Sequence, residues 1–421
     1  MKNYHKFVLL TAIPTALFAC HIQADQTPAF ISDATATLES RTYFFSRDFS
    51  DIVGPSTQSK AQETAQGFIF NFASGYTSGP VGLGADVIAT AGIKLDSSPD
   101  RANTGLLYTD SDGHVPNEYA RLAGALRLKL AETVLRIGEL QPNLPVLAFS
   151  DIRLLPPSYQ GASLISKDIN NLTLQAGQLR STSLREDPGR TDMLAMVGFV
   201  PNRTADTDRF EYAGADYAFT NNRTTVSLWY AQLKDIYNQR FFGLKHNEPV
   251  GDWVLGANLG YYDSSEDGNK LIGEVDNRAL YSLFSAGRGN HKFHLGYQQM
   301  FGDHGFPRVF ANVSPLGNEL PTYSFDSAEE RSWQARYDYN FVGWNIPGLT
   351  STLRYIKGDN VRVGDSNSGR EFERDLDLAY TFQKGSLKNL SIRMRNVTAR
   401  SSYKTDINEN RLIISYTLGL F

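Results

Sequence analysis

Basic side chains recur at alternate positions in several segments, a spacing that could line a surface for binding carboxylates. Arg121, Arg127 and Lys129 share one side of 121–130, and Arg393 and Arg395 share one side of 390–398. A guanidinium presents its donors as a planar fork that matches the two oxygens of a carboxylate. Several such sites of moderate strength in series would let a carboxylate move along without being trapped. The residues therefore predict binding and transit of small anions.

The segments that carry these cations have a period of two. Between residues 332 and 341 the apolar and polar positions separate completely, and the apolar set is Trp333, Ala335, Tyr337, Tyr339 and Phe341. Such a period indicates extended strands with two different faces. A lipid-embedded barrel places apolar side chains outside and encloses a polar lumen, which spares the arginines the cost of burial in an apolar core.

Alternating stretches of this kind continue along the whole chain, separated by clusters of Gly, Asp, Asn and Ser. About 400 residues at roughly 10 per strand plus connections allow 16 to 18 strands. The connections 343–347 and 384–389 are short, whereas 140–167, 302–326 and 359–370 are long, and the first two of these long connections are rich in proline. We expect one all-β domain over 25–421, a transmembrane antiparallel β-barrel with long extracellular loops that fold inward. Phe421 would need a bulge near Gly419 to face lipid.

The first 24 residues predict a secretory signal peptide. Lys2 and Lys6 precede an apolar run over 7–19, and Ala24 offers a cleavage site before Asp25. Cys20 raises the alternative of a lipid anchor, for which Phe18 fits poorly. Because Cys20 is the only cysteine, the mature chain has no disulfides, and a large sheet must hold it together.

Charge and motifs exclude several other functions. Without the two lysines of the leader, 39 basic residues face 45 acidic ones, a net charge of −6, which argues against nucleic acid as a partner. The acidic runs 110–113 and 263–267 lack the closing Glu of a calcium loop, and His291 and His294 have no third ligand nearby. No metal and no cofactor is expected.

The chain resembles the OprD family of Gram-negative outer-membrane channels, also called the Occ carboxylate channels. The matching segments run nearly the whole mature length and are Ala65–Phe68, Ser74–Thr77, Gly92–Asp96, Thr104–Leu107, Arg153–Pro156, Gly302–Asp303, Gly305–Pro307, Ala328–Gln334, Arg354–Asn360, the pair Arg393 and Arg395, and Arg411–Tyr416. Each segment is a weak signal, and their shared order in one chain is a strong one.

The resemblance implies an 18-stranded outer-membrane barrel, monomeric or loosely associated, that passes small carboxylate solutes along a ladder of basic side chains. The ladder candidates are Arg41, Arg121, Arg127, Lys129, Arg336, Arg354, Arg393, Arg395 and Arg411. It also implies two constricting loops, around 154–161 and 302–320, with Tyr159 and Asp303 at the constriction. Arg308, Val309 and Phe310 depart there from the more polar family pattern. Inward acids such as Asp338, Asp375 and Asp377 could guide an ammonium group.

Three alternatives stay open at this level. The inward arginines could pair with inward acids and only stabilise the lumen. An outer-membrane barrel hydrolase, a lipase or protease, would need a catalytic group at the rim, for which His291 or His294 is the only candidate. A structural barrel with a plugged lumen is the third alternative, although so many charges argue against a dry plug.

Overall fold

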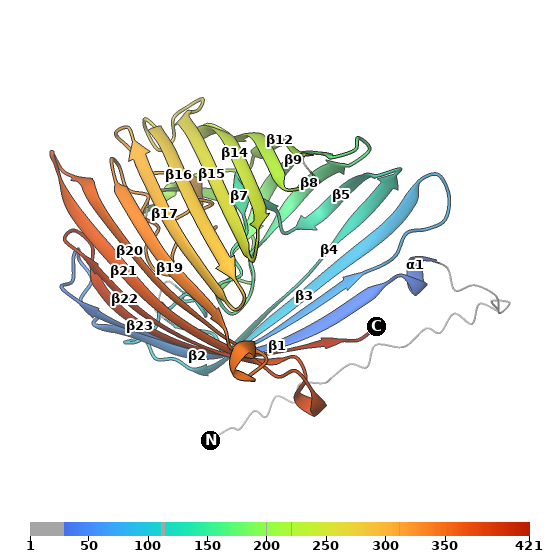
Figure 1. Ribbon diagram of the computed structural model, residues 1–421, viewed down its shortest axis with the longest axis horizontal. Coiled ribbons are helices and arrows are strands. Elements are labelled where there is room, and N and C mark those ends of the chain that lie inside the picture. The colour runs from blue at the N-terminus through green and yellow to red at the C-terminus, as the bar shows by residue number, and fades with distance from the viewer. Residues whose placement is uncertain (1–28, 111–113, 199, 220, 311) are drawn as a thin grey trace, which may run out of the picture.

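A computed structural model describes residues 29–110, 114–198, 200–219, 221–310 and 312–421. These residues form a closed barrel of 18 antiparallel strands (Figure 1). The wall strands are β1 (Thr35–Ser50), β2 (Lys60–Ala73), β3 (Gly82–Asp96), β4 (Glu118–Leu130), β5 (Thr133–Leu140), β8 (Ser158–Ser166), β9 (Leu172–Ser183), β12 (Phe210–Phe219), β13 (Thr224–Leu233), β14 (Tyr237–Val250), β15 (Trp253–Glu266), β16 (Asp276–Arg288), β17 (His291–Phe301), β19 (Arg331–Asn340), β20 (Leu349–Val363), β21 (Ser366–Thr381), β22 (Leu390–Ser401) and β23 (Asp406–Gly419). The strand number expected from the family resemblance is confirmed.

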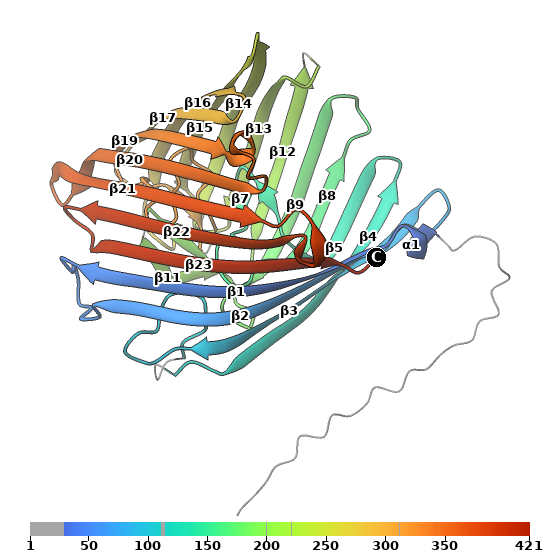
Figure 2. The same cartoon turned by 60° about the horizontal axis from the view of Figure 1, so that its bottom comes forward.

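The barrel closes where its first strand meets its last. Figure 2 shows β1 lying between β2 and β23, and the register pairs Arg41 with Ser415 and Phe45 with Arg411. The predicted leader and Cys20 lie outside the described residues. The helices among the described residues are all short: α1 (Ala29–Ser32), η1 (Phe341–Trp344) and η2 (Gly385–Leu387). None of these helices is long and apolar enough to cross a membrane.

The predicted division of each strand into two faces is present in the structure. On β4, Leu122 and Leu126 point outward and are 77% and 66% exposed, whereas Arg127 points inward and is 7% exposed. On β19, outward Trp333 is 46% exposed and inward Gln334 is 2% exposed. Apolar side chains therefore cover the outside, and polar ones face the enclosed space, hereafter the lumen.

Four connections at one end are long and fold into the lumen: L2 (97–117), L3 (141–157), L4 (184–209) and L7 (302–330). L3 contains the short strands β6 (Asn143–Leu144) and β7 (Leu147–Ala148); L4 contains β10 (Met193–Val197) and β11 (Val200–Thr207), which join β18 (Pro307–Val309) of L7 in a small separate sheet. The run 308–310 that departs from the family pattern thus belongs largely to a strand that ties L7 to L4.

Two connections expected to be long are shorter in the structure. The stretch 140–167 contains the wall strand β8, and within 359–370 only residues 364–365 lie between β20 and β21. The C-terminal bulge is present, because Leu420 N donates to Ala36 O while Ala36 N donates to Phe421 O, so that two residues face one. The ring of Phe421 then meets the ring of Phe72 on the outer face.

Apolar contacts seat the inward loops on the inner wall. Leu154 and Leu155 of L3 pack with Tyr43 and Phe45 of β1. Tyr323 and Phe325 of L7 pack in a second cluster with Ile356 of β20 and strands β22 and β23. Burial of such side chains stabilises by about 25 cal/mol per Å² of apolar surface removed from water. The loops are therefore packed parts of the fold, which fixes the path that the lumen leaves open.

Candidate pore and its lining residues

Arg41, on β1, holds L3 inside the lumen. Its Nη1 donates to Asp151 Oδ1 at 2.7 Å and to the carbonyl oxygen of Arg153 at 2.8 Å, and its Nη2 donates to Asp151 Oδ2 at 3.1 Å. Glu39 accepts from its Nε. The guanidinium is thus occupied on all its edges, and its role in this structure is to anchor a loop.

Arg121, on β4, joins two loops in the same way. Its Nη1 donates to the carbonyl oxygen of Leu184 in L4 and its Nη2 to that of Pro156 in L3, both at 2.8 Å. The planar fork carries donors on two nitrogens in a fixed geometry, so one side chain holds both backbone carbonyls. The end of L3 and the start of L4 are therefore fixed relative to one another.

Arg354 and Arg411 anchor L7. Arg354 Nη1 donates to the carbonyl oxygen of Glu319 at 3.1 Å, and Arg411 Nη2 donates to that of Pro321 at 3.2 Å. Arg411 is only 2% exposed and also pairs with Glu409. Four of the nine ladder candidates are thus hydrogen-bonded to the backbone of an inward loop.

Arg336, Arg393 and Arg395 keep a larger part of their surface in the lumen. Arg393 and Arg395 of β22 both donate to Asp377 of β21, at 2.9 Å and 2.7 Å, and their side chains are 48% and 19% exposed. Arg336 of β19 pairs with Asp338 and is 32% exposed. Two guanidiniums thus share the one carboxylate of Asp377.

Arg127 and Lys129 lie near the end with the short connections. Arg127 pairs with Asp86 at 2.8 Å and stacks on the ring of Tyr76, 4.7 Å from its centroid. Lys129 pairs with Glu132 and also lies over Tyr76. These two residues are inward or at the rim, as the alternation predicts, and are separated from the arginines of β19–β23.

The two expected constriction residues lie in different places. Tyr159, at the start of β8, is fully buried and donates its hydroxyl to Asn312 of L7. Asp303 has a side chain that is 66% exposed and pairs with Arg362 of β20. That Asp303 narrows the channel stays a prediction.

The sequence prediction missed Arg153 in L3. This side chain is 6% exposed, lies 4.9 Å from the centroid of the Phe45 ring, and forms no ion pair among the described residues. Arg47 and Arg411 stack on the same ring at 4.7 Å and 4.6 Å. Burial, and then the repulsion from Arg411 and other cations, lowers the pKa of Arg153 well below its ordinary value. A loop residue belongs to no alternating stretch, so the period of two could not find it.

A row of acids on β21 also serves as a loop anchor. Glu371, Glu373, Asp375 and Asp377 occupy four successive inward positions, and all are buried. Glu373 accepts hydrogen bonds from the backbone nitrogens of Thr322 and Tyr323 in L7. Asp375 and Asp377 were singled out from the sequence, and the structure places them on the wall beside Arg354 and Arg395.

Comparison with known proteins settles the family. The family model described as outer membrane porin, OprD family, matches residues 28–420. The chain belongs to the OprD family. It is 42% identical over 417 residues to the porin-like protein GalP of Pseudomonas putida, covering 98% of each chain. The resemblance noted in the sequence is thereby confirmed.

Solved structures of OprD-family channels match the whole barrel. The crystal structure of Pseudomonas aeruginosa OccK9 (OpdG) superimposes with a TM-score of 0.90 at 47% identity, covering 93% of this chain and 100% of that one. Pseudomonas aeruginosa OpdK, crystallised with vanillate, superimposes with a TM-score of 0.87 at 41% identity and the same coverage. This OprD-family chain is therefore an outer-membrane porin and not an enzyme. By the rule for such barrels, the long loops are extracellular and the short turns periplasmic.

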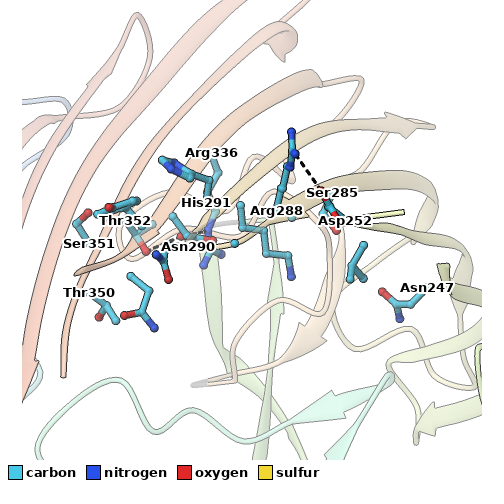
Figure 3. Close-up of a pocket in the computed structure, with 17 residues that line it drawn as sticks. Asn247, Asp252, Ser285, Arg288, Asn290, His291, Arg336, Thr350, Ser351 and Thr352 are labelled. Carbon is cyan, nitrogen blue, oxygen red and sulfur yellow. Dashed lines mark hydrogen bonds and ion pairs between the residues drawn. The ribbon is translucent and has the colours of Figure 1, made fainter. Parts of the chain in front are cut away.

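In this OprD-family porin, a cavity of about 560 Å³ lies along β15–β17, β19 and β20, near the periplasmic turns. Figure 3 shows Arg336, Thr352 and Ser285 around it, together with the Arg288–Asp252 ion pair. His294, lining β17 nearby, contacts Asp338 at 3.0 Å, while the hydroxyl of Thr352 contacts the other oxygen of Asp338. The hydroxyl of Thr352 thus contacts the carboxylate of Asp338 and not the imidazole of His294. A hydroxyl nucleophile would need the hydrogen bond to the imidazole, which acts as its base.

Proposed function

We propose that this outer-membrane porin is selective for small, water-soluble solutes that carry a carboxylate. The observation that carries the proposal is the wall of β22, where Arg393 and Arg395 share the single carboxylate of Asp377 and remain partly exposed to the lumen. A carboxylate that enters from water must replace its hydration, and guanidiniums with free edges offer charge-assisted hydrogen bonds that do so.

The arginines fall into two groups with different contacts, and this difference supports the proposal. Arg41, Arg121, Arg354 and Arg411 fix the loops that narrow the lumen, and Arg336, Arg393 and Arg395 lie beside the space left open. Fixed loops keep a solute close to this wall. The binding sites there are of moderate strength, because each arginine already has a carboxylate partner, so a solute can bind and leave.

The likeness to solved channels adds a second support. OpdK was crystallised with vanillate, a carboxylate, and shares 41% of its sequence with this chain. The net charge of −4 for the whole chain does not oppose carboxylate entry, because the local field of the lining residues governs what enters a narrow pore.

The test is single-channel recording of the refolded mature chain in a planar bilayer, with benzoate added to the extracellular side. Benzoate and benzamide are compared at equal concentration, since they differ chiefly in charge. We expect benzoate to interrupt the current and benzamide to leave it unchanged. In the Arg393→Ala/Arg395→Ala variant we expect the benzoate interruptions to shorten several-fold, while Arg223→Ala, which removes an exposed ion pair near the periplasmic turns, leaves them unchanged. Equal effects of benzoate on the double variant and on the unchanged chain would contradict the proposal.

A further inference from the structure

Three cations lie on the outer surface of two neighbouring wall strands. We call them the outer cationic patch, and they are Lys357 of β20 and Arg370 and Arg374 of β21. All three are exposed, whereas Ile356 and Glu373, beside them on the same strands, are fully buried and face the lumen. Because side chains alternate along a strand, the three cations point away from the lumen. Figure 2 shows β20 and β21 side by side on one flank of the barrel.

The outer cationic patch begins where the apolar band of the wall ends. On β20 the outward positions run from Leu353 through Tyr355 to Lys357, and on β21 the outward position after Leu376 is Arg374. Leu353 and Leu376 are 49% and 48% exposed on the outer face. The change from apolar to charged side chains lies toward the end of the wall that carries the long loops. In an outer-membrane barrel this height is the extracellular interface of the membrane.

The patch has no acidic partner among the residues that the structure describes. Lys357, Arg370 and Arg374 form no ion pair there. The next outward acid on β20 is Asp359, and Arg331 of β19 already binds it, with Nη2 2.9 Å from Oδ1. Three positive charges therefore stand together at the membrane boundary without a protein carboxylate to neutralise them.

Neutral side chains of β22 orient the guanidinium of Arg374. Its Nη2 donates to Oδ1 of Asn396 at 2.9 Å and to Oγ1 of Thr398 at 3.0 Å. Its Nε and Nη1 make no hydrogen bond within the described part of the chain. The guanidinium is thus positioned but keeps its charge and several of its donors, which is what the oxygens of a phosphate require.

Aromatic rings lie between the cations and the apolar band. In the register of β20 and β21, Tyr355 is opposite Arg374 and Phe372 is opposite Lys357. The rings of Tyr355 and Phe372 stack with centroids 5.8 Å apart, and Trp333 of β19 lies 5.5 Å from Tyr355 on the other side. Tyr and Trp are enriched where a membrane meets water. The outer surface therefore offers charge and apolar contact next to one another.

We propose that the outer cationic patch binds the phosphorylated headgroup of a lipid in the outer leaflet, with the acyl chains of that lipid along Leu353 and Leu376. Arg374 donates to the phosphate oxygens, and Lys357 and Arg370 add attraction at the membrane surface. A free phosphate would use only the cations. The adjoining apolar band fits a molecule that is anionic at one end and apolar at the other.

The experiment measures the affinity of diphosphoryl lipid A, a phosphorylated glycolipid, for the full mature chain in detergent micelles by native mass spectrometry. Lys357→Gln/Arg374→Gln weakens binding by about thirtyfold, because each cation at a membrane surface contributes about a fivefold factor. The matched control is Arg240→Gln/Arg278→Gln. It also removes two outward cations, on β14 and β16, but there Asp263 lies between them in the register. The control leaves the affinity unchanged.

Inorganic phosphate distinguishes a lipid site from a site for the free anion. Equimolar phosphate leaves the binding of lipid A unchanged, and both double variants still migrate as heat-modifiable barrels on a gel. Equal affinity of the unchanged chain and Lys357→Gln/Arg374→Gln for lipid A, an equal loss in the control, or displacement of lipid A by equimolar phosphate would overturn the proposal. Because the substituted side chains all lie outside the lumen, the benzoate interruptions persist in both variants, and this test is independent of the test of the proposed function.

Discussion

The hydroxyl of Tyr159, at the start of β8, donates a hydrogen bond of 2.8 Å to Oδ1 of Asn312 in L7. Both residues are buried. An antiparallel backbone bridge between Ala148 of L3 and Val313 of L7 is a second link between these two parts of the chain. L3 leads directly into β8, so the narrow part of the lumen depends on two loops that are far apart in sequence but joined to one another.

Tyr159→Phe should loosen this junction. The change removes the donor and leaves Asn312 Oδ1 buried without it, which costs about 1 to 3 kcal/mol. We expect more frequent current fluctuations in single-channel recordings, with the barrel still heat-modifiable on a gel. Tyr261→Phe, on the outward side of β15, serves as the control. If the current of the Tyr159→Phe channel fluctuates no more often than that of the unchanged chain, L3 and L7 are held together without this hydrogen bond.

Arg41→Lys should widen the channel although it keeps the charge. A lysine is a point donor and cannot bridge Asp151 and the carbonyl oxygen of Arg153 as the guanidinium fork does. We expect a higher mean conductance because L3 is no longer fixed to β1. Arg223→Lys, at an exposed pair, should leave conductance unchanged. If Arg41→Lys conducts like the unchanged chain, the fork is not what seats the loop.

Asp377→Asn should strengthen carboxylate binding. The substitution removes the charge that Arg393 and Arg395 share, so both guanidiniums become available to a solute. We expect the residence of benzoate to lengthen several-fold and the passage of cations to fall, both measured by single-channel recording. Shorter residence would mean that Asp377 orients the two arginines more than it neutralises them.

The seating of L7 should weaken as the pH rises. Burial raises the pKa of the Glu319 carboxyl from 4.5 to about 7, and the nearby Arg308 only partly opposes this. Because the pKa is higher in the seated loop than in a solvated one, the stability of the seated loop is greatest below pH 4.5 and is lost between pH 4.5 and 7. Current fluctuations should therefore be more frequent at pH 8 than at pH 5.

Glu319→Gln should remove most of this pH dependence, since the amide stays neutral throughout. Glu274→Gln, at an exposed position between β15 and β16, should keep it. A pH dependence that survives Glu319→Gln would point to another titrating group.

The wall of the barrel could be predicted from the sequence because alternation is a local property. The inward positions of Arg336, Arg393 and Arg395 follow from the parity of their neighbours. The contacts of the inward arginines cannot be predicted in this way. Arg41 and Arg121 donate to carbonyl oxygens of loops more than 30 residues away, and the alternation within a strand does not indicate the path of a loop. Arg153 was missed for the same reason. Strand β8 was taken for a loop because its sequence, SYQGASLIS, alternates weakly.

The placement of Arg41 on β1 and of Arg411 on β23 has a consequence for assembly. These strands are the first and last of the wall, and they pair only when the sheet closes into a ring. The Arg41 anchor of L3 and the Arg411 anchor of L7 are therefore brought side by side only when that seam forms. Closure of the ring thus couples the two inward loops, because one anchor of each loop lies on a strand of the same seam.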